Sequence, residues 1–170
     1  TGAENAILDG FTVTRGWASE GAGMYGANNV VNCMFLENTA YGPGGGGMYI
    51  ENESPVMSNC IFQGNTALDP SGFYGCAAGG GIYCVGSFPV IVNCTFHSNA
   101  ALSAGGGLHA NTGLYYYSLP TVVNCIFWDN AAQESPEIYE ASGSVRYSCI
   151  QGGYPGEGNI AVSPLFSDFS

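Results

Sequence analysis

Lysine is absent from this sequence, and arginine occurs only as Arg15 and Arg146, against 13 acidic residues. The formal net charge is −11 at pH 7. Proteins that bind nucleic acid or anionic lipid need clustered basic side chains, so the composition excludes nucleic acid as a partner and electrostatic attachment to a membrane surface. The same acidity suits solubility outside the cell, and we predict an extracellular or cell-surface location.

Long apolar runs and helical periodicity are also missing. No segment is apolar over the length that a bilayer-spanning helix needs, so we predict no membrane insertion. Thr1–Asn5 has neither the basic nor the apolar region of a secretory signal peptide, which predicts a mature or trimmed form. Charged residues make up only 9 %, compared with about a quarter in typical domains. This composition would indicate disorder if the remaining residues were not periodic.

The most regular feature is a repeated block, Asn-Cys-x-Phe-x-x-Asn. Its copies span 32–38, 59–65, 93–99 and 124–130, with degenerate versions at 10–16 and 148–154. The starting positions 10, 32, 59, 93, 124 and 148 are separated by 22, 27, 34, 31 and 24 residues. A second block, Gly-Gly-Gly followed by an apolar residue and then Tyr or His, lies at 45–49, 79–83 and 105–109. The ordered recurrence of both blocks indicates structural repeats.

The shortest interval between repeats indicates the architecture. Short β-branched and aromatic runs broken by Gly and Asn are typical of strands. A unit of 22 residues is too short for a propeller blade of about 40 residues, but it suits one solenoid coil with two or three short strands. We therefore predict an all-β fold, a right-handed parallel β-helix (β-solenoid) of about six coils that forms one domain over residues 1–170.

In such a solenoid, equivalent residues of successive coils stack about 4.8 Å apart. The repeats predict two Asn ladders at bends, where Asn tolerates left-handed backbone and bonds to its neighbours. They also predict internal columns of Cys, extended by Cys149, and of Phe. The members of these columns are Asn32, Asn59, Asn93, Asn124, then Asn38, Asn65, Asn99, Asn130, then Cys33, Cys60, Cys94, Cys125, and finally Phe35, Phe62, Phe96, Phe127.

On these residues the chain resembles right-handed parallel β-helix repeat proteins of bacterial secreted and surface polypeptides. The pairing of Gly-Gly-x-Ile with Phe-x-x-Asn is similar to the repeats of polymorphic outer-membrane proteins. The segment from Cys149 through Asn159 to Phe166 resembles the end of a β-helix in bacterial exported proteins. The resemblance covers nearly the whole chain and implies the fold, because the shared positions belong to the scaffold.

Seven cysteines are an odd number, so at least one thiol is free or pairs between chains. Stacked parallel Cys side chains are slightly too far apart for unstrained bridges, which favours buried thiols in the column. Cys76 and Cys84 lie outside the column and are the candidate disulfide. No spacing suits a zinc site, and we predict no cofactor. Calcium remains a weak alternative, with carboxylates at Glu37, Glu51, Glu53, Asp69, Asp129, Glu134, Glu137 and Glu140 as the available ligands.

The repeat alignment gives little support to the hypothesis that the protein is an enzyme, and we predict no catalytic residues. Arg15 aligns with Glu37 of the next coil, which suits a surface ion pair. Glu37 and Asp129 occupy equivalent positions three coils apart, about 14 Å, which is too far for a glycosidase pair. A polysaccharide lyase or hydrolase therefore remains the least favoured alternative.

Two exposed features suggest interactions instead. The column after Cys, comprising Met34, Ile61, Thr95, Ile126 and Ile150, would face outward and could bury against a partner. Tyr115, Tyr116 and Tyr117 form a loop cluster suited to protein contact or to stacking on sugar rings. Without a capping helix, both solenoid ends would expose strand edges.

These observations leave two main functions. The first is a non-catalytic structural protein that stacks head to tail with itself into a filament, or serves as a surface stalk or adhesin that contacts another surface protein or a glycan. The second is a carbohydrate-binding module that uses the aromatic loops.

Overall fold

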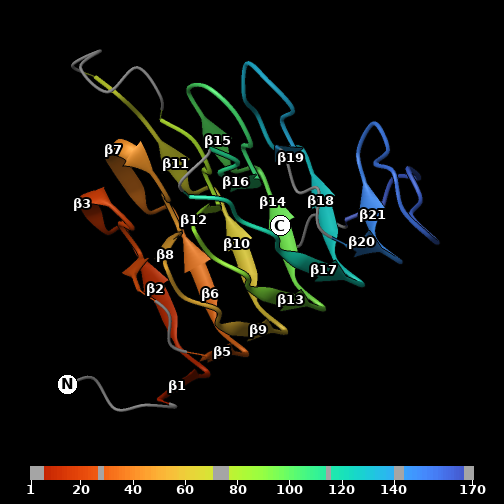
Figure 1. Cartoon of the computed structure of the whole chain (residues 1–170), viewed down its shortest axis with the longest axis horizontal. Coiled ribbons are helices and arrows are strands. Elements are labelled where there is room, and N and C mark those ends of the chain that lie inside the picture. Colours follow the sequence, from red (N-terminus) through yellow and green to blue (C-terminus); the bar gives the residue numbers. More distant parts are fainter. Residues whose placement is uncertain (1–5, 27–28, 71–76, 114–115, 140–143, 167–170) are drawn as a thin grey trace.

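The computed structural model describes residues 6–26, 29–70, 77–113, 116–139 and 144–166. Within these ranges the chain forms strands and no helix. Accordingly, the described part of the chain has no helix of the length and apolarity that a membrane crossing requires. Every strand pairing is parallel, and successive coils follow one another along a single axis, from the red to the blue end in Figure 1. The structure is the predicted right-handed parallel β-helix.

Among the described residues, each of the first four coils contains four strands rather than the two or three expected, because the Gly-rich block and the segment before each Asn-Cys block also pair between coils; the fifth coil has three strands and the sixth has two. The first two sheets, A and B, each have six strands. Sheet A comprises β1 (Ile7–Asp9), β5 (Asn29–Val31), β9 (Val56–Ser58), β13 (Val90–Val92), β17 (Thr121–Val123) and β20 (Val145–Arg146). Sheet B comprises β2 (Thr12–Thr14), β6 (Met34–Leu36), β10 (Ile61–Gln63), β14 (Thr95–His97), β18 (Ile126–Trp128) and β21 (Cys149–Ile150).

The other two sheets, C and D, complete the first four coils, and sheet D continues into the fifth. Sheet C has four strands, β3 (Trp17–Glu20), β7 (Thr39–Gly44), β11 (Thr66–Ala67) and β15 (Ala100–Ala101). Sheet D has five, β4 (Met24–Tyr25), β8 (Met48–Glu51), β12 (Ile82–Val85), β16 (Leu108–Ala110) and β19 (Ile138–Tyr139). The strands are short because each coil must turn four times, and at most of these corners one residue adopts a left-handed conformation.

The corners explain the polar repeats. Between sheets A and B, Asn32, Asn59, Asn93 and Asn124 all have φ of 53–55°, a conformation that Asn tolerates and most residues avoid. Between sheets C and D, the first glycine of each Gly-Gly-Gly block turns the chain, as at Gly79 with φ 63°. The third glycine has a different role: a Cβ on Gly81 would lie 2.4 Å from the Gly107 carbonyl oxygen and 3.0 Å from the Phe96 ring. Only glycine lets the backbone approach this closely.

The core is a set of columns along the axis. Phe35, Phe62, Phe96 and Phe127 are fully buried and stack with ring centroids 4.4–4.8 Å apart and planes within 2–3° of parallel. Inward-facing aliphatic residues of sheets A and D fill the remaining interior. The predicted Phe column is therefore confirmed, and the core it forms runs the length of the solenoid.

Candidate functional site

The first ladder runs along the outside of the A–B corner. The side-chain amide of each Asn donates to the Asn of the preceding coil, at 2.7–3.3 Å, and Asn32 donates to the Asp9 carboxylate at 2.9 Å. All donors in this outer ladder thus point toward the N-terminal end, where a carboxylate receives the last of them. At the other end Asn124 keeps an open acceptor, since no described residue hydrogen-bonds to its Oδ1.

The second ladder is buried just after the B–C corner and has the opposite polarity. Asn38, Asn65 and Asn99 each donate to the next coil's Asn at 2.9–3.0 Å. Asn130 then donates to the carboxylate of Glu137, which is only 7 % exposed. Burial raises the pKa of Glu137 to about 7, although the Asn130 amide opposes that rise. The repeats predicted this inner ladder, but not the carboxylate that ends it, because Glu137 replaces the third glycine of the Gly-rich block in a weaker copy at 136–139.

The Cys column has a specific polar role. After each left-handed Asn, the backbone N–H points along the axis, and the side chain of the next coil accepts it, as Cys125 Sγ does from Cys94 N at 3.4 Å. The same sulfur donates to the Val123 carbonyl at 3.3 Å. The column's cysteines are free, buried thiols, as predicted.

The predicted disulfide is not supported. Cys84 is a free thiol with no exposed surface, because β12 directs it into the core between Ile50 and Ala110 of the neighbouring coils. Burial raises its pKa. Cys76 lies outside the described residues.

In the last coil the repeat alignment was wrong by one residue. Cys149 pairs with Ile126 and Ile150 with Phe127, so Ser148 occupies the Cys column and Ile150 is buried in the Phe column. Ser148 Oγ accepts Cys125 N at 3.0 Å, as a Cys side chain does elsewhere. The outward stripe therefore consists of Met34, Ile61, Thr95, Ile126 and Cys149. Only its N-terminal half is well exposed, at 37 % for Met34 and 36 % for Ile61.

The C-terminal half of the stripe lies beside a segment that follows the last coil. Ile160 bridges to Cys149 as a further rung of sheet B, and Asn159 Oδ1 accepts the Ser148 N–H. The Asn159 side chain also donates to the carbonyls of Val145, Tyr154 and Pro155. The expectation of an uncapped C-terminal end is thus wrong: residues 154–160 cover the edges of sheets A and B without forming a helix.

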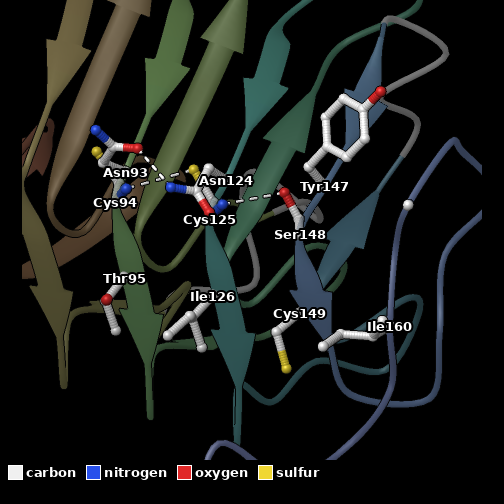
Figure 2. Close-up of a pocket in the computed structure, with 11 residues that line it drawn as sticks. Asn93, Cys94, Thr95, Asn124, Cys125, Ile126, Tyr147, Ser148, Cys149 and Ile160 are labelled. Atoms are coloured by element: carbon white, nitrogen blue, oxygen red, sulfur yellow. Dashed lines mark hydrogen bonds between the residues drawn. The ribbon is translucent and has the colours of Figure 1, made fainter.

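A cavity of about 350 Å³ lies between this segment and the A–B corner (Figure 2). Three rungs of the corner, from coils four to six, form its floor, and Gly158 and Ile160 form part of its wall. Thr95, Ile126, Cys149 and Ile160 lie in one row across it, with Asn93 and Asn124 beside them. None of its lining residues is charged.

Comparison with known proteins places this geometry in a family. The family model for a right handed beta helix region matches residues 1–149. The chain belongs to this β-helix family. No curated protein matches it significantly. Nor does any solved structure.

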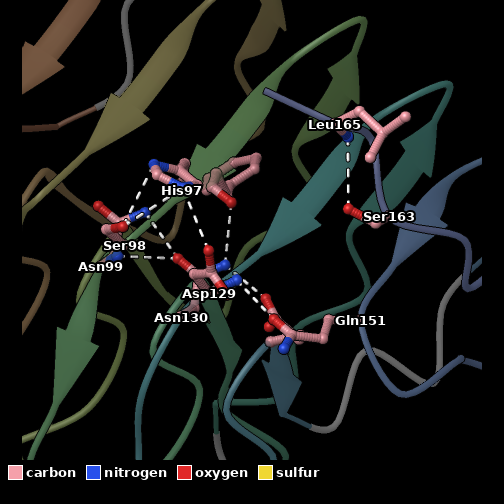
Figure 3. Close-up of polar contacts among 10 residues, drawn as sticks. His97, Ser98, Asn99, Asp129, Asn130, Gln151, Ser163 and Leu165 are labelled. Atoms are coloured by element: carbon pink, nitrogen blue, oxygen red, sulfur yellow. Dashed lines mark hydrogen bonds and ion pairs between the residues drawn. The ribbon is translucent and has the colours of Figure 1, made fainter. Parts of the chain in front are cut away.

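Membership in the β-helix family does not decide between catalysis and a structural role, since function depends on sites carried by the fold. A cluster of polar side chains on the surface surrounds Asp129 (Figure 3). His97 Nε2 lies 3.5 Å from Asp129 Oδ2, and the His97 ring packs edge-on against Phe166 at 4.9 Å. Repeat reasoning missed this contact, because Phe166 comes from the segment beyond the coils.

The same cluster brings together Ser98, His97 and Asp129, the residue types of a hydrolytic triad. However, Ser98 Oγ lies 3.2 Å from Nδ1 and 3.4 Å from Nε2 of His97, so the hydroxyl sits over the ring and not in its plane. A general base must accept the proton through an in-plane lone pair. This arrangement therefore lacks the geometry of a nucleophile and its base.

A second cavity, of about 470 Å³, is lined by both Asp129 and Glu137. The structure thus brings two carboxyl groups together that the sequence placed in different features. Glu137 is held by the buried ladder, whereas the Asp129 side chain is 55 % exposed.

The remaining predicted positions are on the surface. Arg15 and Glu37 form the predicted ion pair at 3.3 Å, with side chains 81 % and 65 % exposed, so its contribution to stability is small. Tyr116 and Tyr117 are 50 % and 47 % exposed, and Tyr115 lies outside the described residues. Calcium binding stays a prediction: in the described ranges no three acidic, Cys or His side chains gather as metal ligands, and Glu140 lies outside those ranges.

The aromatic position of the Gly-rich block forms a column on the outside of sheet D. Neighbouring rings in Tyr25, Tyr49, Tyr83, His109 and Tyr139 lie 4.7–5.4 Å apart. Burial lowers the pKa of His109 to about 4, so the ring is neutral and packs like its tyrosine neighbours.

Proposed function

We propose that this β-helix is an extracellular, non-catalytic structural module that serves as a stalk or adhesin. The observation that carries the proposal is the continuity of the columns. Two amide ladders, a Phe stack and a Cys column run through successive coils. Their residues stiffen the axis and leave the outward positions free to vary.

Charge supports an exposed role. With a net charge of −11 and no lysine, the module repels copies of itself and other anionic surfaces, which favours solubility at low ionic strength. Glycans and protein surfaces are the partners that this composition fits, and nucleic acid is not.

End-to-end filaments are a less favoured form of the same proposal. A second copy that paired with β20 and β21 would first have to displace residues 154–160, which occupy those edges. A stalk that presents its side faces needs no such displacement.

Carbohydrate binding is the second candidate, because aromatic rings are exposed. Trp17 and Tyr41 stack at 5.6 Å on sheet C while remaining 66 % and 39 % exposed. Exposed rings of this kind pack on the apolar face of sugars. A bacterial polymorphic outer-membrane-type origin, implied by the sequence resemblance, would suit either function.

Surface labelling tests the location, and electron microscopy tests the assembly. Antibodies to the purified module should label intact source cells, and micrographs should show separate short particles. Labelling that appears only after lysis would overturn the extracellular assignment. Extended fibres would favour the filament form.

Catalysis is tested separately. The module is incubated with neutral and uronate polysaccharides beside a double variant, Asp129→Asn with Glu137→Gln. We expect no product from either protein. Product from the parent alone would overturn the non-catalytic proposal and place an active site in the cavity between these carboxyl groups.

A further inference from the structure

The cavity beside the last coil differs from the rest of the A–B corner in one residue. Four coils place Asn in the left-handed corner position, but Tyr147 occupies it in the sixth, with φ 51°. No hydrogen bond joins its side chain to Asn124, so the outer ladder stops there and the Asn124 carbonyl oxygen remains open. The corner groove therefore ends at an aromatic ring beside an unused acceptor.

The Tyr147 ring is held in place by the C-terminal segment. The nearby Glu157 side chain raises the pKa of its hydroxyl. A Cβ on Gly158 would lie 2.4 Å from Cδ1 of the ring, so glycine is needed for the backbone to approach the ring so closely. Tyr147 is nonetheless 50 % exposed. It is a fixed aromatic wall with free surface.

Two polar groups that line the cavity are unused. Asn124 Oδ1 and the Thr95 hydroxyl make no hydrogen bond to any described residue. Ile126 and Ile160 supply apolar surface between them, with Ile160 55 % exposed. A volume of about 350 Å³ is within the range of small-molecule sites, roughly 300–1,000 Å³.

The geometry points to a binding site for a neutral saccharide in this cavity. A pyranose ring offers what the lining lacks: a hydroxyl donor for Asn124 Oδ1, a second hydroxyl for Thr95, and a C–H face for Ile126, Ile160 and the Tyr147 ring. An anionic sugar is disfavoured, because the lining has no cation and the whole chain carries a charge of −11. This site adds a glycan contact to the proposed stalk, and neither Tyr116 nor Tyr117 lines it.

The direct test is nuclear magnetic resonance of the asparagine side-chain amides. The sugars are titrated to about 50 mM, so that binding as weak as a Kd near 1 mM, about −4 kcal/mol, still approaches saturation. The panel consists of glucose, galactose, mannose and N-acetylglucosamine, with their disaccharides. We expect at least one neutral sugar to shift the Asn124 amide signals saturably. Glucuronate should bind more weakly than glucose.

The most informative variant is Tyr147→Asn. It restores the residue that the other corners use, so it folds, and the introduced amide donates to Asn124 Oδ1 while the ring is lost. We expect binding to weaken by roughly tenfold or more, the effect of losing a stacking surface and a hydrogen-bond acceptor together. Tyr116→Ala is the matched control, because Tyr116 is equally exposed, at 50 %, and should bind unchanged.

Three results would overturn this site. The first is the absence of any saturable shift across the panel with folded protein. The second is tighter binding of glucuronate than of glucose. The third is binding that survives Tyr147→Asn but is lost in Tyr116→Ala, which would move the glycan to the loop. None of these bears on surface labelling or particle shape, so the stalk proposal stands or falls separately.

Discussion

At the scale of single residues, the Cys column shows why a thiol recurs where a smaller apolar residue would also fit. Each side chain must accept an N–H from the preceding coil and donate to a carbonyl two residues earlier in its own coil. Ser148 performs both roles in the last coil, at 3.0 and 2.9 Å. The repeated Cys is thus a polar connector of the corner as well as a core residue.

Two substitutions at Cys125 separate these roles. Cys125→Ser keeps both hydrogen bonds and should cost less than about 1 kcal/mol of unfolding free energy. Cys125→Ala leaves the Cys94 N–H buried without a partner and should cost about 2–3 kcal/mol. Urea denaturation measures both. Equal losses would mean that volume alone selects the residue.

At the scale of the repeated element, the two Asn ladders have unequal importance. Asn99 has no exposed surface. Its side-chain amide accepts a hydrogen bond from Asn65 and donates to the Phe62 carbonyl and to Asn130. The outer Asn59 is exposed, and water can replace its neighbours. Burial makes the inner ladder the stabilising one.

We expect Asn99→Ala to destabilise the fold by about 3 kcal/mol or more, since several buried polar groups lose their partners at once. Asn59→Gly retains a residue that accepts left-handed backbone and should cost about 1 kcal/mol or less. Thermal unfolding followed by circular dichroism compares them. A larger loss of stability for Asn59→Gly than for Asn99→Ala would contradict the conclusion that the inner ladder contributes more to stability.

Glu137 makes the inner ladder sensitive to pH. Its folded pKa of about 7 exceeds the ordinary value of 4.5, so between these values the folded state keeps a proton that the unfolded state releases. The contribution of this protonated carboxyl group to the free energy of unfolding is therefore fully present below pH 4.5 and is lost as pH rises through 7. The loss is at most about 3 kcal/mol. Glu137→Gln removes this dependence, because the amide does not titrate.

The measurement is the difference in unfolding free energy between Glu137→Gln and the parent at pH 5 and pH 8. The difference should grow in favour of the variant at the higher pH, while the other carboxylates cancel between the two proteins. A constant difference would show that Glu137 does not titrate in this window.

At the scale of the whole molecule, the C-terminal segment determines how the solenoid ends. Without an amphipathic helix, Asn159 and its neighbours occupy backbone groups of β20 and β21 that would otherwise be open to another chain. Exposed edges of this kind promote association between molecules.

Asn159→Ala should therefore increase self-association, because its side chain satisfies three carbonyls at that end. Analytical ultracentrifugation should show a monomeric parent and larger species in the variant, with Tyr116→Ala as a surface control that stays monomeric. If parent and variant sediment alike, the segment does not protect the edge.

The sequence by itself determined the coils, the Asn ladders, the Phe stack and the free thiols of the Cys column. In a solenoid each repeat contacts the next in register, so spacing along the chain maps directly onto neighbours in space. Even there, one ambiguous copy at 148–154 was misplaced by a residue, because Ser148 replaces the marker Cys and Cys149 follows it.

Only the tertiary structure decided the roles of residues that depart from the repeat pattern or lie beyond the last coil. Glu137 at the end of the inner ladder, Phe166 on His97 and Tyr147 beside Gly158 all join segments whose separation follows no period. Their positions depend on how the last loops and the final segment fold back on finished coils. No spacing rule encodes such contacts, and the candidate sites lie among them.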